Sequence, residues 1–487
     1  MIEKELIFSK SVEGRKAYTL PKTEVPDVSI SLGEKFKRND KVMLPEVSEN
    51  ELQRHMVNLS NKNYHIDKNM YPLGSCTMKY NPKVNEVAAR LEGFSMLHPL
   101  QEDESIQGAL ELIFKLQHFL CEISGMKAVS LQPAAGAHGE FAGILTIRKY
   151  HENRGDLEKR KVILVPNSAH GTNPASAAMC GFKVVSVNSL ENGQVDIDDL
   201  KSKLNDEVAG MMLTNPNTVG IFETRISEIC DLVHDAGGLM YMDGANLNAI
   251  LGISRPGDMG FDVMHFNLHK TFSTPHGGGG PGCGPVGVGE RVSNYLPRPV
   301  VEKHGDKYVL KCECQNSIGR LHAFWGNFGM MVRAYTYILV HGSKGLREIS
   351  ENAIINANYI LNVLKDYYDA PYSSEKIMHE AILSSHTLKK KYDVSTLDVA
   401  KRLMDYNFHP PTVYFPLIVH ECLMIEPTET ESKERIDSFC DAMIKIAEEA
   451  ATDAELVRTA PHTLAMGRLD DAYAAKNINV CCRVDFD

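Results

Sequence analysis

Two side chains that could do chemistry follow neighbouring candidate strands. Asp243 directly follows the apolar run Leu239–Met242, and Lys270 comes just after the next such run, Phe261–Leu268. A lysine held in a poorly solvated place can act as an amine nucleophile. A carboxylate beside it could take part in the reaction or could be only its salt-bridge partner. The two residues alone leave both interpretations open.

A third feature is the segment Gln132–Glu140, which follows another candidate strand and opens a helix. Its small residues Ala135, Gly136 and Ala137 leave backbone N–H groups open to a phosphate, and the helix dipole favours negative charge there. Small residues at such a turn are as often explained by packing alone. His138 could lie flat on a cofactor ring, or it could cap the helix or belong to the core.

These three features together match the requirements of pyridoxal 5′-phosphate (PLP). Its phosphate needs a helix N-terminus, its aldehyde needs an amine, and its ring nitrogen needs an anion that keeps it protonated. We therefore predict a PLP site in which Lys270 meets the aldehyde, Asp243 the ring nitrogen, and residues 135–137 the phosphate.

A glycine run at residues 277–287 contains a formal G-x-G-x-x-G at Gly282, Gly284 and Gly287. We reject a dinucleotide site there. The run leads into a strand instead of a helix, and Pro285 lacks the N–H that would bind phosphate. A turn in which two backbone segments approach closely is the better interpretation.

The elements that must position these residues alternate between short apolar runs and amphipathic helices. Such alternation predicts an α/β fold whose mainly parallel, seven-stranded sheet is covered on both faces. The helix over residues 225–236 illustrates the pattern, with apolar residues three and four apart and a Gly-Gly stop. The seven candidate strands are Ala128–Leu131, Val162–Val165, Lys183–Val187, Gly210–Leu213, Gly238–Met242, Val263–Leu268 and Val286–Val288.

The chain divides by composition into three predicted parts. Residues 1–104 form an N-terminal arm that includes the loop Tyr71–Pro82, residues 105–330 the large PLP-binding domain, and residues 331–487 a smaller α+β domain. In the last part, residues 329–340 and 432–449 read as helices. The segments Ile377–Ser384 and Thr412–Val419 read as strands.

Composition excludes several classes of protein. The 487 residues carry a net charge of −11, which argues against a general nucleic-acid binder, and no apolar run is long enough for a membrane span. The eleven cysteines lack zinc-site spacing, so we predict no metal site and mostly buried thiols. The acidic start Met1–Glu5 does not resemble a targeting signal, and we expect a cytoplasmic protein.

Over nearly its whole length the chain resembles the glycine dehydrogenase (decarboxylating) family, the P-protein of the glycine cleavage system, in subunit 2 of its two-subunit form. The motifs Asp243–Asn246 and Asn267–Phe272 are specific in combination. The stretches that carry the resemblance are Leu73–Asn81, Gln132–Glu140, Asn167–Ala178, Leu213–Glu223, Met242–Asn248, Asn267–Gly287, Pro410–Ser432 and Ala460–Asp470.

The resemblance implies a fold type I, aspartate-aminotransferase-like architecture. Lys270 would be the Schiff-base lysine, Asp243 would lie at the pyridine nitrogen, and His138 would stack on the ring. Asn267 stands where many such enzymes have Ser or Thr and could donate through its amide. Further cofactor or substrate contacts are expected from Ala245, His269, Thr214, His170, Thr172, Asn215 and Asn217, although turn chemistry alone explains 171–174 and 215–217.

The implied activity is PLP-dependent decarboxylation of glycine, in the oxidoreductase class. CO₂ would be released and the aminomethyl group transferred to the lipoyl group of H-protein. The implied partners are lipoylated H-protein and a separate subunit 1 without this lysine. We expect the lipoyl arm to enter through a channel walled by Tyr71–Pro82 and the glycine run Gly277–Gly284.

Two other interpretations stay open. An aminotransferase, or a decarboxylase of another amino acid, would use the same lysine and acid. A subunit that keeps the fold without chemistry is the second alternative, and the presence of Lys270 together with Asp243 argues against it.

Overall fold

The computed structural model describes residues 6–22, 24–26, 33–40, 42–275 and 282–479. The chain divides into two compact units, residues 69–460 and a second unit formed by residues 1–68 with 461–487. Among the described residues of the second unit, the α-helices are α1 (Glu49–Ser60) and α14 (Asp471–Lys476). The predicted three-part division stays a prediction; its boundary at residue 331 lies inside helix α9 (Phe328–Leu364).

A seven-stranded sheet forms the centre of the unit 69–460, with strand order β1-β7-β6-β5-β4-β2-β3. All pairs are parallel except those that β7 makes with β1 and β6. Each strand overlaps one of the seven candidate runs, so the predicted mainly parallel sheet is confirmed. The strands are β1 (Ala128–Ser130), β2 (Val162–Pro166), β3 (Lys183–Val187), β4 (Val208–Thr214), β5 (Leu239–Gly244), β6 (Val263–Phe266) and β7 (Val286–Val288).

Helices cover both faces of this sheet, because neighbouring residues of each central strand point to opposite sides. Met211 of β4 packs in one core and Met212 in another. The first core includes α4 (Gln107–Ser124), α7 (Ile197–Lys203), α8 (Ile226–Asp235) and the first half of α9. The second includes α5 (Gly136–Arg154) and α6 (Thr172–Met179). The helix predicted over residues 225–236 corresponds to α8 and buries Ile226, Ile229, Cys230 and Val233.

The C-terminal part of this unit contains a three-stranded antiparallel sheet with order β10-β12-β11. Its strands are β10 (Ala381–Ser384), β11 (Thr412–Val413) and β12 (Cys422–Ile425). They pack with α10 (His386–Tyr392), α11 (Thr396–Asp405), α12 (Lys433–Thr452) and α13 (Ala454–Arg458) around a separate core. In this sequence-predicted α+β region, β10 and β11 are shorter than the predicted runs, and β12 was not predicted.

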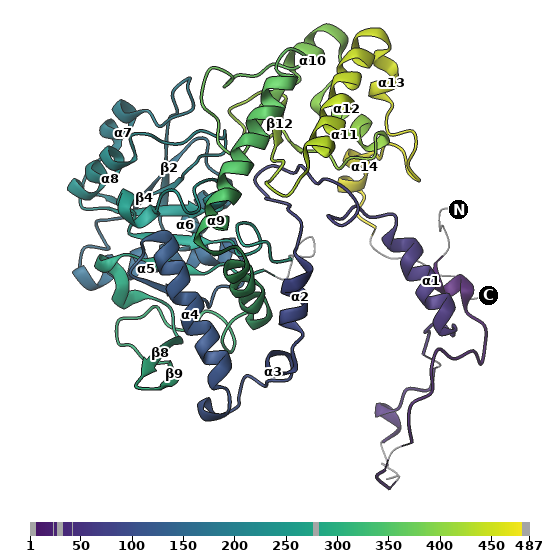
Figure 1. Ribbon diagram of the computed structural model, residues 1–487, viewed down its shortest axis with the longest axis horizontal. Helices are drawn as coiled ribbons and strands as arrows, with labels where there is room; N and C mark the ends of the chain where they lie inside the picture. The colour runs from purple at the N-terminus through teal and green to yellow at the C-terminus, as the bar shows by residue number, and fades with distance from the viewer. Residues whose placement is uncertain (1–5, 23, 27–32, 41, 276–281, 480–487) are drawn as a thin grey trace. The chain divides into compact units, whose positions relative to one another are not determined.

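Helix α9 connects the two cores. It begins beside α4 and ends beside α12 (Figure 1). Gly342, with φ 60°, interrupts its helical geometry. Besides short 3₁₀ helices, the unit also contains α2 (Lys83–Ala89), α3 (Glu92–Ser95) and the hairpin strands β8 (Val300–His304) and β9 (Lys307–Lys311).

The nine cysteines in the described part of the chain are all free thiols, and five of them are buried. Cys312 and Cys314 are therefore not paired with each other, and the adjacent Cys481 and Cys482 lie outside the described residues. Among the described helices, none combines the length and the apolar composition needed to cross a bilayer.

Candidate active site

Most of the predicted site residues meet at one cavity of about 180 Å³, where β5, β6 and the start of α5 come together. Asp243 belongs to the carboxyl end of β5, and Lys270 follows β6 by four residues. This edge of a parallel sheet is where ligands bind in open α/β folds. The lining residues are Ser75, Gly136, Ala137, Glu140, His170, Thr172, Asp243, Ala245, His265, Asn267, His269 and Lys270.

Asp243 is buried and held by three neighbours. Asn173 donates through Nδ2 to Oδ2 at 2.9 Å, the backbone N–H of Ala245 donates to Oδ1 at 2.9 Å, and His265 Nε2 lies 3.3 Å from Oδ1. Burial raises the pKa of this carboxyl, but His265, the bond from Asn173 and the charge of Lys270 outweigh it and hold the pKa below its usual value. Asp243 is therefore an anion at neutral pH.

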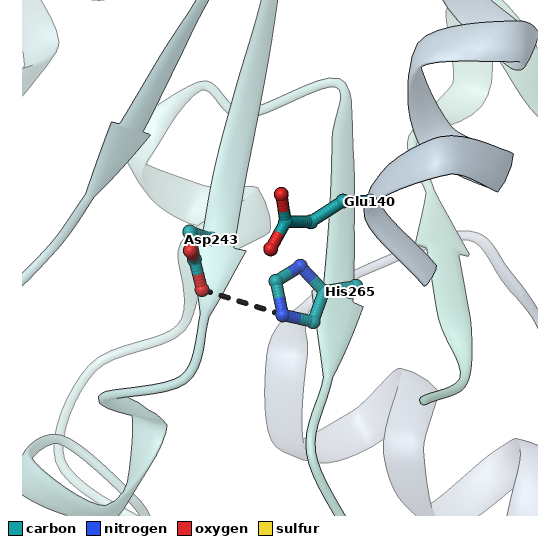
Figure 2. A group of neighbouring side chains, drawn as sticks. All are labelled: Glu140, Asp243 and His265. Atoms are coloured by element: carbon teal, nitrogen blue, oxygen red, sulfur yellow. Dashed lines mark ion pairs between the residues drawn. The ribbon is translucent and has the colours of Figure 1, made fainter. Parts of the chain in front are cut away.

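His265 connects Asp243 to the rest of the site. It is the register partner of Asp243 on β6, so both side chains lie on the same face of the sheet. Its Nδ1 lies 2.7 Å from the hydroxyl of Tyr241, and its Nε2 lies 2.9 Å from Oδ1 of Asn267. Because Nε2 faces two oxygen acceptors, it carries the ring hydrogen there. Figure 2 shows the imidazole next to both carboxyl groups, with its ion pair to Asp243.

Glu140 is a second buried acid beside Asp243. It accepts hydrogen bonds from the hydroxyls of Thr172 at 2.8 Å and Ser176 at 3.1 Å. Burial and then the negative charge of Asp243 raise its pKa, which favours its protonated form. Glu140, Asp243 and His265 offer three ligand atoms within 4.8 Å of one another (Figure 2). In the structure His265 pairs with Asp243, while Glu140 accepts its hydrogen bonds from neutral hydroxyl groups.

The start of α5 forms a cradle of backbone amides. Ala135 is the N-cap, and no side chain caps the first turn. A Cβ atom on Gly136 would lie 2.2 Å from Nδ2 of Asn267. Since Oδ1 of Asn267 faces His265, its Nδ2 is the donor group; it lies 3.4 Å from Nε2 of His269, and its second hydrogen stays available at the helix start. Close backbone approach is also found at Gly284, whose N–H donates to the Pro133 carbonyl at 2.9 Å. Residues 277–281 of the glycine run lie outside the described residues.

Five predicted site residues do not line this cavity: Ala135, His138, Thr214, Asn215 and Asn217. Ala135 is the N-cap residue of α5 and precedes the lining residues Gly136 and Ala137. His138 accepts a hydrogen bond at Nδ1 from the Ala134 N–H, 3.1 Å away; burial and then His322 lower its pKa, so its imidazole is neutral. Thr214 instead lines a separate cavity of about 10 Å³, together with Asn217.

The side chains of Asn215 and Asn217 instead accept hydrogen bonds from the backbone of the segment that follows them. Asn215 Oδ1 accepts the Glu223 N–H at 2.9 Å, and Asn217 Oδ1 accepts the Val219 and Ile221 N–H groups at 3.1 Å. His170 and Thr172 both line the main cavity, with Nδ1 and Oγ1 2.9 Å apart.

Sequence reasoning missed Asn173, His265, Glu140 and Ser75. His265 could have been found, because it precedes Asn267 by two positions, and alternate residues of a strand share a face. Asn173 and Glu140 come from two different helices, and no local pattern reveals that they approach Asp243. Ser75 lies in the loop Tyr71–Pro82, a predicted wall of the entry channel, and it lines the cavity beside Lys270.

Comparison with protein families gives two matches. The model described as "Glycine cleavage system P-protein" matches residues 19–309, and the model described as "Glycine dehydrogenase, C-terminal domain" matches residues 349–463. Together they span most of the chain.

Curated relatives are similar over the full length. A protein of Chloroherpeton thalassium named "Probable glycine dehydrogenase (decarboxylating) subunit 2" is 61% identical over 481 residues, 98% of this chain and 97% of the relative. A protein of Alkaliphilus oremlandii with the same name is 57% identical over 478 residues, 98% of each chain.

Solved structures share the fold at low identity. A crystal structure of an inhibitor-bound glycine decarboxylase (P-protein) matches with TM-score 0.72 and 18% identity, over 85% of this chain and 93% of that one. An apo cysteine desulfurase from Thermococcus onnurineus matches with TM-score 0.61 and 14% identity, over 78% and 95%. The predicted fold type I architecture is confirmed.

Proposed function

The chain belongs to the P-protein family of the glycine cleavage system, and from this membership we propose that it catalyses the decarboxylation of glycine with PLP as cofactor. The observation that carries the proposal is that Lys270, Asp243 and the uncapped start of α5 line a single cavity. These are the amine, the anion and the amide cradle that PLP requires, so the residues present fit the group.

Each residue would have a distinct role toward the cofactor. Lys270 would hold the aldehyde through Nζ, and Asp243 would keep a proton on the ring nitrogen. The N–H groups of Gly136 and Ala137, together with Nδ2 of Asn267, would bind the phosphate at the positive end of the helix dipole. When bound, PLP supplies the sink for the electrons that departing CO₂ leaves behind.

The neighbours of Asp243 would keep its carboxylate ionised. Asn173, His265 and the Ala245 N–H stabilise the ionised carboxylate. The raised pKa of Glu140 reduces the negative charge that it places beside Asp243. We keep His138 as the residue that stacks on the ring, because its neutral imidazole heads α5 next to Ala137. Ala245, His269, His170 and Thr172 would contact cofactor or substrate from the cavity wall. Ala135 and Thr214 have no contact with the cavity to support a direct role.

The partners belong to the same proposal. The relatives are named as a subunit 2, which supports pairing with a second subunit. An exposed apolar row on and after α2, formed by Val84, Val87 and Leu91 at spacings of three and four, would suit such a contact. Lipoylated H-protein is the proposed acceptor, with its arm entering past Ser75. A cytoplasmic location stays a prediction from the sequence.

Borohydride reduction of the PLP-saturated protein, purified with its partner subunit, tests the cofactor assignment. Peptide mapping should find a pyridoxyl group on Lys270, and Lys270→Arg should abolish the label. Lys127→Arg, at a half-exposed surface lysine, is the matched control and should leave the label unchanged. An unlabelled Lys270 in the wild type would overturn the assignment.

The choice of substrate needs a second measurement. Exchange of labelled carbonate into glycine, dependent on lipoylated H-protein, is expected only for glycine cleavage. Amino-group transfer to a keto acid without carbonate exchange would instead identify an aminotransferase.

A further inference from the structure

A second group of buried titratable side chains lies outside the predicted site. His379 and Glu380 precede β10, Glu426 follows β12, and each is fully buried. The antiparallel register pairs Ala381 with Ile425, and its continuation sets Glu380 opposite Glu426. Like charges directly opposite each other destabilise a sheet, and more so without water. Two ionised carboxylates at this position would therefore need a positive charge or a proton to offset their repulsion.

Both carboxyl groups hold the same loop. The Ser75 N–H donates to Glu380 Oε2 at 2.7 Å, and the Thr77 N–H donates to Glu426 Oε2 at 2.9 Å. The Thr77 hydroxyl also donates to Glu426 Oε1 at 2.6 Å. Asn246, three residues after Asp243, donates to Glu380 Oε1 at 3.3 Å. The pair thus joins the loop 75–77 to the strand end that carries Asp243.

This loop has an unfavourable backbone. Ser75 has φ 65° and Thr77 has φ 48°, in the left-handed region that residues with a Cβ rarely adopt. Such conformations persist only where surrounding contacts impose them. Since Ser75 lines the cavity beside Lys270, the glutamate bonds fix part of the cavity wall.

Burial of the pair and the repulsion between its two carboxyl groups favour retention of a proton. Burial and then Glu426 raise the pKa of Glu380 well above its usual value, and burial raises the pKa of Glu426 to about 7. The hydrogen bonds from Ser75 and Thr77 oppose these shifts, as do the charges of Lys270 and, at Glu426, Lys79, but they do not outweigh burial. The nearby thiols of Cys76 and Cys422 have pKa values raised chiefly by burial, so they are neutral.

His379 adds no positive charge. Burial and then Lys270 lower its pKa to about 3. Neither ring nitrogen has a hydrogen-bond partner, although Nε2 lies 3.6 Å from Glu380 Oε1 and 3.9 Å from Glu426 Oε1. A neutral imidazole nitrogen at this distance is an acceptor toward which a protonated Glu380 can turn.

His379, Glu380 and Glu426 offer three ligand atoms within 4.8 Å of one another, but a metal ion fits among them less well than a proton does. All four carboxyl oxygens already accept an N–H or O–H group. The charges of Lys270 and Lys79 would also repel a metal ion.

We propose that Glu380 and Glu426 hold a single proton between them and act as positioning residues, which fix the Ser75–Thr77 loop at the wall of the Lys270 cavity while that proton is bound. Loss of the proton leaves two facing negative charges and releases the loop. The importance of this wall rests on the proposed function, but the proton and the loop can be measured without PLP, glycine or turnover.

Amide hydrogen exchange of the full chain tests the loop. In the wild type, protection of the peptide spanning residues 73–79, corrected for intrinsic exchange, should fall as pH rises from about 4.5 through about 7, by up to about tenfold per pH unit. Glu380→Gln and Glu426→Gln keep a carbonyl oxygen that accepts the loop N–H but cannot ionise, so protection should stay high across this range. The α4 peptide 110–120 is the internal control and should behave alike in all three proteins.

Three outcomes would overturn the proposal. The first is wild-type protection of residues 73–79 that does not change with pH. The second is a loss of protection at neutral pH in Glu380→Gln, which would mean that both carboxylates are ionised and needed as such. The third is a stoichiometric divalent ion that Glu380→Gln removes. Infrared spectroscopy supplies a direct readout, since the wild type at neutral pH should show a protonated-carboxyl stretch from this pair that the difference spectrum against Glu380→Gln isolates.

Discussion

His265 faces Asp243 across two adjacent parallel strands, with Nε2 of the imidazole 3.3 Å from Oδ1 of the carboxylate. The other carboxylate oxygen, Oδ2, accepts the side-chain amide of Asn173. Asp243 is thus held between a strand neighbour and a helix neighbour, and both favour its ionised form. The reactivity proposed for the site depends on these two contacts as much as on Asp243 itself.

Asn173→Ala should move the acid limb of the kcat/KM profile to higher pH. The folded protein holds the pKa of Asp243 below its usual value, so removal of one donor raises it, by up to about one unit. The carboxylate would then be lost earlier as pH falls. The pH dependence of CO₂ release measures the effect. Asn153→Ala, at an exposed asparagine of α5, should leave the limb in place. An unmoved limb in Asn173→Ala would argue against the role of that bond.

Gly136→Ala should weaken cofactor binding. The new methyl group would meet Nδ2 of Asn267 at 2.2 Å, which forces the amide away from the helix start. The affinity for PLP should fall by about tenfold or more, the equivalent of one lost hydrogen bond to a charged group. A fluorescence titration with PLP measures this. Gly108→Ala is the control, because nothing lies within 4 Å of its Cβ position. Equal affinities for both variants would contradict the proposed phosphate site.

Lys79→Met should destabilise the fold strongly. Lys79 is buried, and its Nζ lies 2.8 Å from Glu429 Oε1 and 2.9 Å from Asn248 Oδ1. Without the ammonium, Glu429 would be a buried charge with no opposite partner, at a cost of about 3–5 kcal/mol in chemical denaturation. Lys344→Met breaks an exposed pair with Glu348 and should cost less than about 1 kcal/mol. Restored stability in Lys79→Met with Glu429→Leu would attribute the loss to the stranded charge.

Glu426→Gln should change how stability depends on pH. The pKa of Glu426 is raised from 4.5 to about 7 in the fold, so the folded state binds its proton more tightly than the unfolded state. The proton on Glu426 therefore makes its full contribution to the free energy of unfolding below about pH 4.5, and this contribution is lost as pH rises to about 7. Relative to Glu426→Gln, the Tm of the wild type should decline across this window. Glu290→Gln, at an exposed acid, should follow the wild type. Parallel Tm curves for wild type and Glu426→Gln would contradict the raised pKa.

The central sheet could be predicted because its middle strands, such as β4 and β5, are fully buried and appear as nearly continuous apolar runs. The C-terminal strands were harder. The run Thr412–Val419 ends as a strand at Val413, since Tyr414 has φ 57° and Pro416 has no N–H for a ladder. Cys422–Ile425 is only four residues long and directly follows this broken run, so periodicity alone did not separate it.

In the candidate site, too, residues placed by local sequence pattern could be predicted, and residues placed by packing could not. Asp243 and Lys270 could be predicted from strand ends, because topology brings those ends to one edge. Asn173 and Glu140 approach Asp243 only because α6 and α5 pack over the sheet. Glu380 adjoins the strand pair β10–β12, which lies more than a hundred residues after Asp243 in the sequence. Sequence reveals the residue types at such positions but not the distances between them.

The shared helix α9 constrains how this protein can be divided. Its first half belongs to the core beneath the large sheet and its second half to the core of the small sheet. A gene split or a circular permutation opened within α9 would leave each fragment with half a helix and a bare apolar stripe. Functional fragments, fusions and chimeras should therefore carry residues 328–364 intact, with their joins in surface loops on either side.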